Sequence, residues 1–373
     1  MKKINWSFDA VDFLRIIAMF CVVLLHFEER IDPVSFTAYK STFPLLAGTP
    51  AWTAVAIFFF ISAYLNIIGF IKGKYQFTLK GILSFYKQRL LRVVLDYYIL
   101  IFVYFIFFYP AALTSDLETF CRMVFFFHNG LFTRGSPECP GHTWFISVIV
   151  QFYLICPLIA YLIYKIKDKK ALVITLFFSV LFIGEGLKIL FSGLHYQDWH
   201  FWYIHFYTSI YGNLDILIAG SLFYLVNSYF DSLERKTYLK IISVVVFSLI
   251  LISNAVVVYL DLIFVARVIY VLPLILASCF VLFMFPKPVK KPYYYPSKLL
   301  VATSYDIYLI HLMIGLHLLR QFHDLNGWGA LGIIILAFLA CFAISGVWLN
   351  IKWAISRLIN HLVNKHKLAK QSN

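Results

Sequence analysis

Long apolar stretches separated by short polar and basic segments dominate the 373-residue chain. A helix needs about 20 predominantly apolar residues to cross a bilayer. That template fits ten stretches, at approximately 11–27, 51–71, 94–112, 143–164, 171–191, 212–229, 239–260, 263–285, 299–319 and 328–350. The pattern therefore predicts an all-α, polytopic bundle of about ten transmembrane helices.

The distribution of basic residues predicts how this bundle is oriented. An even number of spans places both termini on one side of the membrane. The termini and the loops on their side carry 24 Lys and Arg residues, whereas the opposite loops carry six. Because cytoplasmic loops are enriched in Lys and Arg, we expect both termini to be cytoplasmic.

Composition and charge narrow the class of protein. With 62% hydrophobic and 13% charged residues, the chain is too apolar for a water-soluble domain. A net charge of +14 would otherwise suggest nucleic-acid binding, but the basic residues lie in short runs between apolar stretches. We therefore expect membrane lipids around the protein and no nucleic-acid partner. We also expect one membrane domain over 1–357, followed by a basic cytoplasmic tail over 358–373. The sequence leaves open whether Cys121 and Cys139, in one predicted outer loop, form a disulfide.

The first apolar stretch contains two ionisable residues, Arg15 and His26. Such groups are costly inside a span and are functional candidates. They are eleven positions apart, about three helical turns, so both should project from one face, with Arg15 nearer the cytoplasm. A structural role is equally compatible with the pattern, with Arg15 paired to Asp12 and His26 at the interface.

The basic loop from Lys72 to Arg92 ends in Lys87, Arg89 and Arg92. Arg89 and Arg92 are spaced i, i+3 at the predicted start of the third span, where they would share a face at a helix N-terminus. That arrangement favours a phosphate-bearing ligand. Ordinary positive-inside topology and contact with lipid headgroups would explain the same residues.

A polar stripe runs along the ninth stretch, where Ser304, Tyr308 and His311 follow i, i+4, i+7 spacing. Such a stripe faces a cavity or forms hydrogen bonds between helices. Glu185 and Lys188, spaced i, i+3, are predicted to form a partly buried ion pair. Three histidines between 191 and 212 are five positions apart, which suits no common helical metal pair, so we expect no metal.

Six loose motifs occur in order along the chain. They are Asp12-Phe13-Leu14-Arg15 with His26, Phe58 to Tyr64, Arg89 with Arg92, Trp144-Phe145 leading to Tyr153 and Pro157, Asp215 with Gly220, and Ser304 to His311. Together with ten predicted spans they resemble the membrane acyltransferase-3 family over nearly the whole chain. Two positions depart from its usual pattern: Ala63 replaces a Gly, and Leu95-Asp96 stands where a Pro usually follows the arginine pair.

The resemblance implies an enzyme of the bacterial inner or plasma membrane. Similar proteins transfer acetyl or other short acyl groups from cytoplasmic acyl-CoA to hydroxyls of extracytoplasmic carbohydrates of the polysaccharide, lipopolysaccharide or peptidoglycan type. The family's arginine and histidine of the first helix match Arg15 and His26, and its cytoplasmic arginine pair matches Arg89 and Arg92.

On this basis we expect the CoA phosphates to bind Arg89 and Arg92, with Lys87 beside them. His26 would act as general base on the acceptor hydroxyl, and Arg15 would orient the donor. Residues expected to line a tunnel or stabilise an oxyanion are Ser62, Trp144, Ser304, Tyr308 and His311. Asp215 would either orient His26 or hold the acceptor. An exporter or flippase of a saccharide or lipid-linked saccharide is the alternative function.

Overall fold

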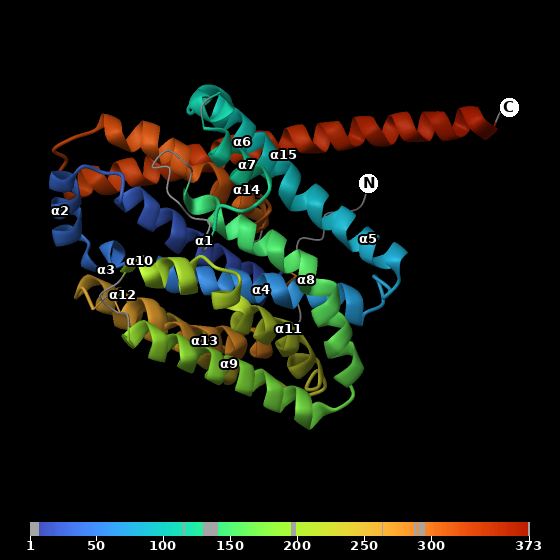
Figure 1. The fold of residues 1–373 in the computed structure, drawn as a ribbon. Coiled ribbons are helices and arrows are strands. Elements are labelled where there is room, and N and C mark those ends of the chain that lie inside the picture. Colours follow the sequence, from blue (N-terminus) through green and yellow to red (C-terminus); the bar gives the residue numbers. More distant parts are fainter. Residues whose placement is uncertain are drawn as a thin grey trace.

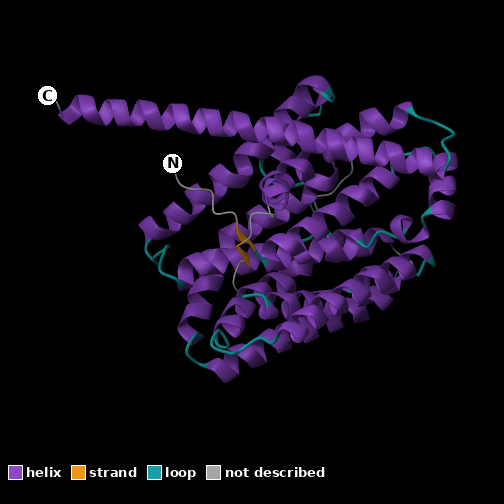
Figure 2. Cartoon of the chain, turned by 180° about the vertical axis from the view of Figure 1, so that it is seen from behind, coloured by secondary structure: helices purple, strands orange, loops and turns teal. Residues whose placement is uncertain are grey.

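The computed structural model describes residues 7–114, 116–129, 141–194, 199–262, 264–286, 289–290 and 295–371. Nearly all of the described chain is helical, which confirms the predicted fold class (Figures 1 and 2). The strands among these residues form one short antiparallel pair, in which β1 (Ser7–Phe8) pairs with β2 (Val289–Lys290), and turns and loops connect the helices.

Nine helices or continuous helical runs within the described residues are long and apolar enough to cross a membrane. They are α1 (Ala10–Glu28), α4 (Ala51–Ile71), the run of α5 (Leu79–Arg89), η1 (Leu90–Val94) and α6 (Leu95–Phe107), α8 (Trp144–Ile166), α9 (Lys170–Leu194), α12 (Thr237–Tyr259), the run of η7 (Val265–Ile269) and α13 (Val271–Met284), α14 (Tyr295–Leu318) and α15 (Gly327–Gln371).

The remaining predicted span is α11 (Leu214–Ser228), which at 15 residues is shorter than the others. It packs mainly against α4 and α9. Gly220 allows this close approach, because a Cβ there would lie 2.4 Å from the Phe60 carbonyl oxygen. Since neighbouring helices enclose most of its side chains, α11 does not need the length that a lipid-exposed span requires.

The two ends of the bundle differ in charge and in structure. Figure 1 shows the start of α1 and the end of α15 at the same end, together with the α4–α5 and α8–α9 connections. We call this the basic end, because Lys72, Lys74, Lys165 and Lys167 lie in those connections or beside them. The positive-inside rule assigns the basic end to the cytoplasm, and this orientation remains a prediction.

Short helices cover the opposite end, which we call the far end, or connect the long helices. They are α2 (Pro33–Thr42), α3 (Pro44–Ala47), η2 (Pro110–Leu113), α7 (Leu117–Val124), η4 (Gly141–Thr143), α10 (Trp199–Trp202), η5 (Tyr203–Tyr207), η6 (Tyr211–Asn213) and η9 (Leu319–Gln321). At the basic end, α15 continues as one helix to Gln371 and projects beyond the other helices (Figure 2).

The helix that carries the arginine pair begins earlier than predicted. It starts at Leu79, where the Thr78 side chain accepts a hydrogen bond from the Gly81 N–H. The expectation that Arg89 and Arg92 lie at a helix N-terminus is therefore wrong, because the unpaired N–H groups of a helix occur in its first turn. Instead, Arg89 is the last residue of α5 and Arg92 lies within the π turn η1, in which the Leu95 N–H donates to the Leu90 carbonyl.

Candidate functional site

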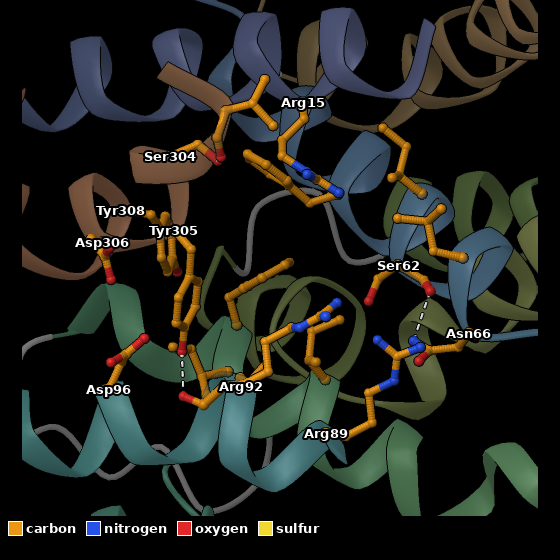
Figure 3. Close-up of a pocket in the computed structure, with 18 of the residues that line it drawn as sticks. Arg15, Ser62, Asn66, Arg89, Arg92, Asp96, Ser304, Tyr305, Asp306 and Tyr308 are labelled. Atoms are coloured by element: carbon orange, nitrogen blue, oxygen red, sulfur yellow. Dashed lines mark hydrogen bonds between the residues drawn. The ribbon is translucent and has the colours of Figure 1, made fainter. Parts of the chain in front are cut away.

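A cavity of about 400 Å³ opens within the half of the bundle nearer the basic end. Arg15 reaches into it from α1, and Arg89 and Arg92 reach into it from α5 and η1 on the opposite wall (Figure 3). We call this space the arginine cavity. The structure thus brings together three of the predicted donor-binding residues from separate segments of the chain.

None of the three cavity arginines forms a salt bridge among the described residues. The Arg89 Nε is buried without a hydrogen-bond partner. Asp12, the suggested partner of Arg15, completes a capping box with Asp9 at the start of α1 and also lies within electrostatic reach of Arg15. Asp96 and Asp306 also line the cavity, but both pair with Lys352. Three arginines without a salt bridge in one cavity favour an anionic ligand.

Polar residues from α4 and α14 complete the cavity wall. Three residues predicted from the sequence line it: Ser62, Ser304 and Tyr308. The Tyr305 hydroxyl donates a hydrogen bond of 2.7 Å to the Val93 carbonyl oxygen, one residue after Arg92 (Figure 3). This bond joins α14 to the π turn η1. It thereby holds the turn in place at the wall of the cavity.

A lysine from α15 closes one side of the arginine cavity. The Lys352 Nζ lies 3.0 Å from Asp96 Oδ2 and 3.0 Å from Asp306 Oδ2. The Trp348 indole N–H also donates to Asp96, at 3.2 Å. The sequence left the role of Asp306 open, and the structure shows it as a carboxylate that ties α14 to α15.

Three aromatic rings form the end of the cavity nearest the far end. Phe58, Phe145 and Tyr308 are the last cavity-lining residues in that direction along α4, α8 and α14. The ring centroids are 5.5 Å apart for Phe145 and Tyr308, 5.8 Å for Phe58 and Phe145, and 6.5 Å for Phe58 and Tyr308. We call these rings the aromatic barrier.

Three histidines pack together beyond the aromatic barrier. The ring centroids of His26 and His311 are 5.0 Å apart, those of His142 and His311 4.9 Å, and those of His26 and His142 6.3 Å. His142 and His311 are buried, whereas His26 is half-buried. The Tyr308 ring contacts both His142 and His311, with centroids 5.6 and 5.7 Å away, so it touches this histidine cluster as well as the arginine cavity.

Hydrogen bonds determine which nitrogen of His26 carries a proton. The His311 Nδ1 lies 2.6 Å from the Tyr308 carbonyl oxygen, so it must be protonated and donate. In a neutral imidazole the other nitrogen accepts, and the His311 Nε2 therefore accepts from the His26 Nδ1, 2.8 Å away. The lone pair of His26 is thus on Nε2, which is the arrangement that a general base requires.

His142 is the member of the cluster that the sequence analysis missed. Its Nε2 donates to the Leu309 carbonyl at 3.1 Å, and its own carbonyl accepts a hydrogen bond from the Tyr308 hydroxyl. Burial, reinforced by the nearby His311, lowers its pKa well below the ordinary histidine value, which keeps it neutral. In the sequence, the only indication of this role for His142 is its position as a single histidine directly before the predicted fourth span.

Three other predicted site residues lie outside the arginine cavity. Trp144 is buried among aromatic rings, with centroids 4.8 Å from Tyr207 and 6.0 Å from Phe59. Lys87 is exposed on α5. Asp215 pairs with a lysine of α9, as described next, and none of the three lines the cavity.

Lys188 connects a buried carboxylate, that of Glu185, and a partly buried one, that of Asp215. Its Nζ lies 2.6 Å from Glu185 Oε1 and 2.9 Å from Asp215 Oδ2. The predicted Glu185–Lys188 ion pair is thus confirmed, and Asp215 extends it. Because His311 is the hydrogen-bond partner of the His26 Nδ1, the suggested orienting role for Asp215 does not match the geometry.

Two predictions from the sequence involve residues outside the described ranges. Cys121 is exposed and free, but Cys139, its suggested partner, is not among the described residues. The same is true of His195, the first of the evenly spaced histidines. Within the described ranges, no group of three or more His, Cys, Asp or Glu side chains has an arrangement that could hold a metal ion.

Comparison with known proteins gives the family. A family model described as an acyltransferase domain matches residues 8–348. The chain is also 27% identical over 197 residues to a Caenorhabditis elegans protein called "Regulator of hypoxia-inducible factor 1", a match that covers 48% of this chain and 39% of that relative. No solved structure matches. With its nine membrane-length helices among the described residues, the chain is a multi-pass membrane protein that belongs to the acyltransferase-3 family.

Proposed function

We propose that the protein transfers a short acyl group, most simply acetyl, from cytoplasmic acyl-CoA to a hydroxyl of an extracytoplasmic carbohydrate in a bacterial plasma membrane. One observation carries the proposal: a cavity with three arginines that form no salt bridge among the described residues and an imidazole with a free lone pair lie on the two sides of a single layer of aromatic rings. A donor can therefore enter from one face and an acceptor from the other.

The arginine cavity suits the phosphate-bearing part of the donor. Guanidinium groups bind phosphate through paired hydrogen bonds. Arg92 is exposed at the mouth, while Arg15 lies half-buried on the opposite wall. A cavity of about 400 Å³ accepts the pantetheine arm and adjoining phosphate, which leaves the nucleotide at the basic end, near the exposed Lys87.

The thioester then has to pass the aromatic barrier. Tyr308 is the ring that contacts both the cavity and the histidine cluster, so its side chain must turn aside to admit the donor. Turning breaks the hydrogen bond from its hydroxyl to the His142 carbonyl, at a net cost of about 1 kcal/mol. A cost of this size is readily offset by binding of the donor.

His26 performs the proton transfer. Its Nε2 accepts the proton of the acceptor hydroxyl, the oxygen attacks the thioester carbonyl carbon, and the C–S bond breaks as the thiol leaves with that proton. His311 holds the ring of His26 by accepting the Nδ1–H bond, and the Tyr308 carbonyl holds His311 in turn. A base oriented by a second group is a common design in acyl transfer.

The test is acyl transfer by the purified, detergent-solubilised protein supplied with labelled acetyl-CoA and a panel of bacterial cell-surface carbohydrates. We expect labelled ester in the carbohydrate and stoichiometric release of free CoA. His26→Ala should lower the turnover by at least 100-fold, the usual contribution of a general base. If no acyl-CoA yields free thiol, or if vesicles containing the protein export a saccharide unmodified, the proposal is wrong and the exporter alternative is favoured.

A further inference from the structure

Arg30 follows His26 by four residues, just past the end of α1. Its backbone N–H donates to the Phe27 carbonyl at 3.0 Å, so the chain still turns as a helix does at this point. Residues four positions apart on a helix lie on the same face. The Arg30 side chain therefore leaves the backbone on the side of α1 that carries His26, beyond the aromatic barrier.

The Arg30 guanidinium has a buried donor without a partner. Its Nε is buried and forms no hydrogen bond. Neighbouring acids do not neutralise it, because Glu28 accepts instead from Tyr39 at 3.3 Å and from Thr49 at 3.2 Å. Glu29 lies within electrostatic reach but forms no salt bridge with Arg30 among the described residues. A buried, charged and unsatisfied donor is costly and requires an explanation.

The charge of Arg30 acts on the whole histidine cluster, since it lies within electrostatic reach of His26, His142 and His311. A fixed cation beside a general base opposes protonation of that base. A cation at this position favours catalysis only if negative charge develops close to it while the proton is transferred to His26. In attack on a thioester, that charge develops on the carbonyl oxygen.

The neutral donors of the cluster are all in use. The His26 Nδ1–H donates to His311, the His311 Nδ1–H to the Tyr308 carbonyl, and the His142 Nε2–H to the Leu309 carbonyl. The Tyr308 hydroxyl donates to the His142 carbonyl. The expectation that His311 stabilises an oxyanion therefore does not fit these contacts, and the Tyr308 side chain turns aside when the donor enters. Arg15 lines the cavity on the other side of the barrier, about 16 Å along α1 from His26.

We infer that Arg30 is the oxyanion donor, with its Nε–H directed at the thioester carbonyl oxygen. This inference rests on the proposed function. The acceptor O–H bond breaks and its proton moves to the His26 Nε2, the new O–C bond forms, and the carbonyl π pair moves onto the oxygen beside Arg30. The pair then re-forms the C=O bond, the C–S bond breaks, and the departing sulfur takes the proton from His26.

The experiment compares two reactions of the full-length protein at saturating acetyl-CoA: transfer to the carbohydrate acceptor, and slow hydrolysis with water as acceptor. Both pass through the same oxyanion, but only transfer uses the carbohydrate site. Arg30→Gln should lower kcat of both reactions by about 100-fold, with little change in KM for the carbohydrate. Arg30→Lys, which keeps the charge, should recover part of the loss, and the exposed Arg320→Gln serves as the matched control.

The other outcomes separate this inference from the function on which it rests. If Arg30→Gln raises KM for the carbohydrate and leaves hydrolysis intact, Arg30 binds the acceptor and the inference is overturned. Unchanged kcat in both reactions overturns it as well. Failure of the wild-type protein to release CoA from any acyl-CoA would instead refute the proposed function. Thermal unfolding of each variant confirms that losses of activity do not reflect unfolding.

Discussion

The His26 Nδ1 and the His311 Nε2 lie 2.8 Å apart, although 285 positions separate the two residues in the sequence. This hydrogen bond joins the first and ninth predicted spans beyond the aromatic barrier. It also sets the tautomer of His26, because the second nitrogen of His311 is committed to the Tyr308 carbonyl. Catalysis by His26 should therefore depend on His311.

His311→Ala should lower kcat by about 10- to 100-fold, since it removes the group that orients the base, while KM for acyl-CoA changes little. Steady-state rates of CoA release test this expectation. His317→Ala is the matched control, because His317 lies on the same helix with an exposed side chain. Equal losses in both variants would show that α14 is merely sensitive to substitution.

Replacement of the cavity arginines should weaken donor binding. A charge-assisted hydrogen bond contributes about 1.5–3 kcal/mol, so Arg89→Gln or Arg92→Gln should raise the dissociation constant for CoA by about 10- to 100-fold. Isothermal titration of the solubilised protein with CoA measures this change. Lys80→Gln, an exposed substitution on the same helix, should have almost no effect. Unaltered affinity in the arginine variants would mean that the phosphates bind elsewhere.

Lys352→Met should destabilise the fold. It leaves the buried carboxylates of Asp96 and Asp306 without the cation that both contact at 3.0 Å. Breaking such a pair costs on the order of 3 kcal/mol, and less where the lysine is partly exposed, as it is here. Thermal unfolding in detergent should show a lower midpoint. Adding Asp306→Asn to the same chain should restore part of the loss, and a further decrease would contradict the electrostatic explanation.

Stability should decline as the pH falls from about 6.5 to 4. His128 is buried against Thr143 and Ser147, and burial lowers its pKa to about 4, whereas an unfolded histidine has a pKa near 6.5. Between these values the unfolded state binds more protons than the folded state, so acid favours unfolding. Melting temperatures measured between pH 7.5 and pH 4.5 test this. The decline should be shallower in His128→Gln, and an identical slope would assign the effect to other groups.

Gly220 and Gly186 should respond oppositely to alanine. A Cβ at Gly220 would lie 2.4 Å from the Phe60 carbonyl oxygen, whereas a Cβ at Gly186 meets no atom within 4 Å. Gly220→Ala should therefore lower the unfolding free energy by about 1–3 kcal/mol. Gly186→Ala, within helix α9, should be neutral or stabilising by up to about 1 kcal/mol. Comparable midpoints for both variants would contradict the close contact of α11 with α4.

Local patterns in the sequence were sufficient for the spans and for the faces of individual helices. The apolar lengths predicted the helices, and the polar positions of α1 and α14 predicted which residues share a stripe. Periodicity does not specify which helix lies opposite a stripe. For that reason the His26–His311 pair, the carboxylates held by Lys352 and the true partner of Asp215 required the structure.

The start of the third span and the role of His142 were missed for different physical reasons. The segment from Leu79 to Arg89 is polar, and apolar length alone cannot separate a polar helical extension from a loop, so the helix start at Leu79 was not recognised. His142 lies in a single 3₁₀ turn, where no periodic pattern exists to indicate its neighbours. Its position depends on contacts with α14.

The aromatic barrier of Phe58, Phe145 and Tyr308 also affects how permeable the membrane is to protons. A water-filled passage from one face of the membrane to the other would conduct protons and dissipate the electrochemical gradient. The three rings place an apolar layer between the cavity and the histidines, which opposes such a column of water. Under the proposed function, one acyl thioester at a time passes this layer. The electrochemical gradient across the membrane is then maintained during acyl transfer.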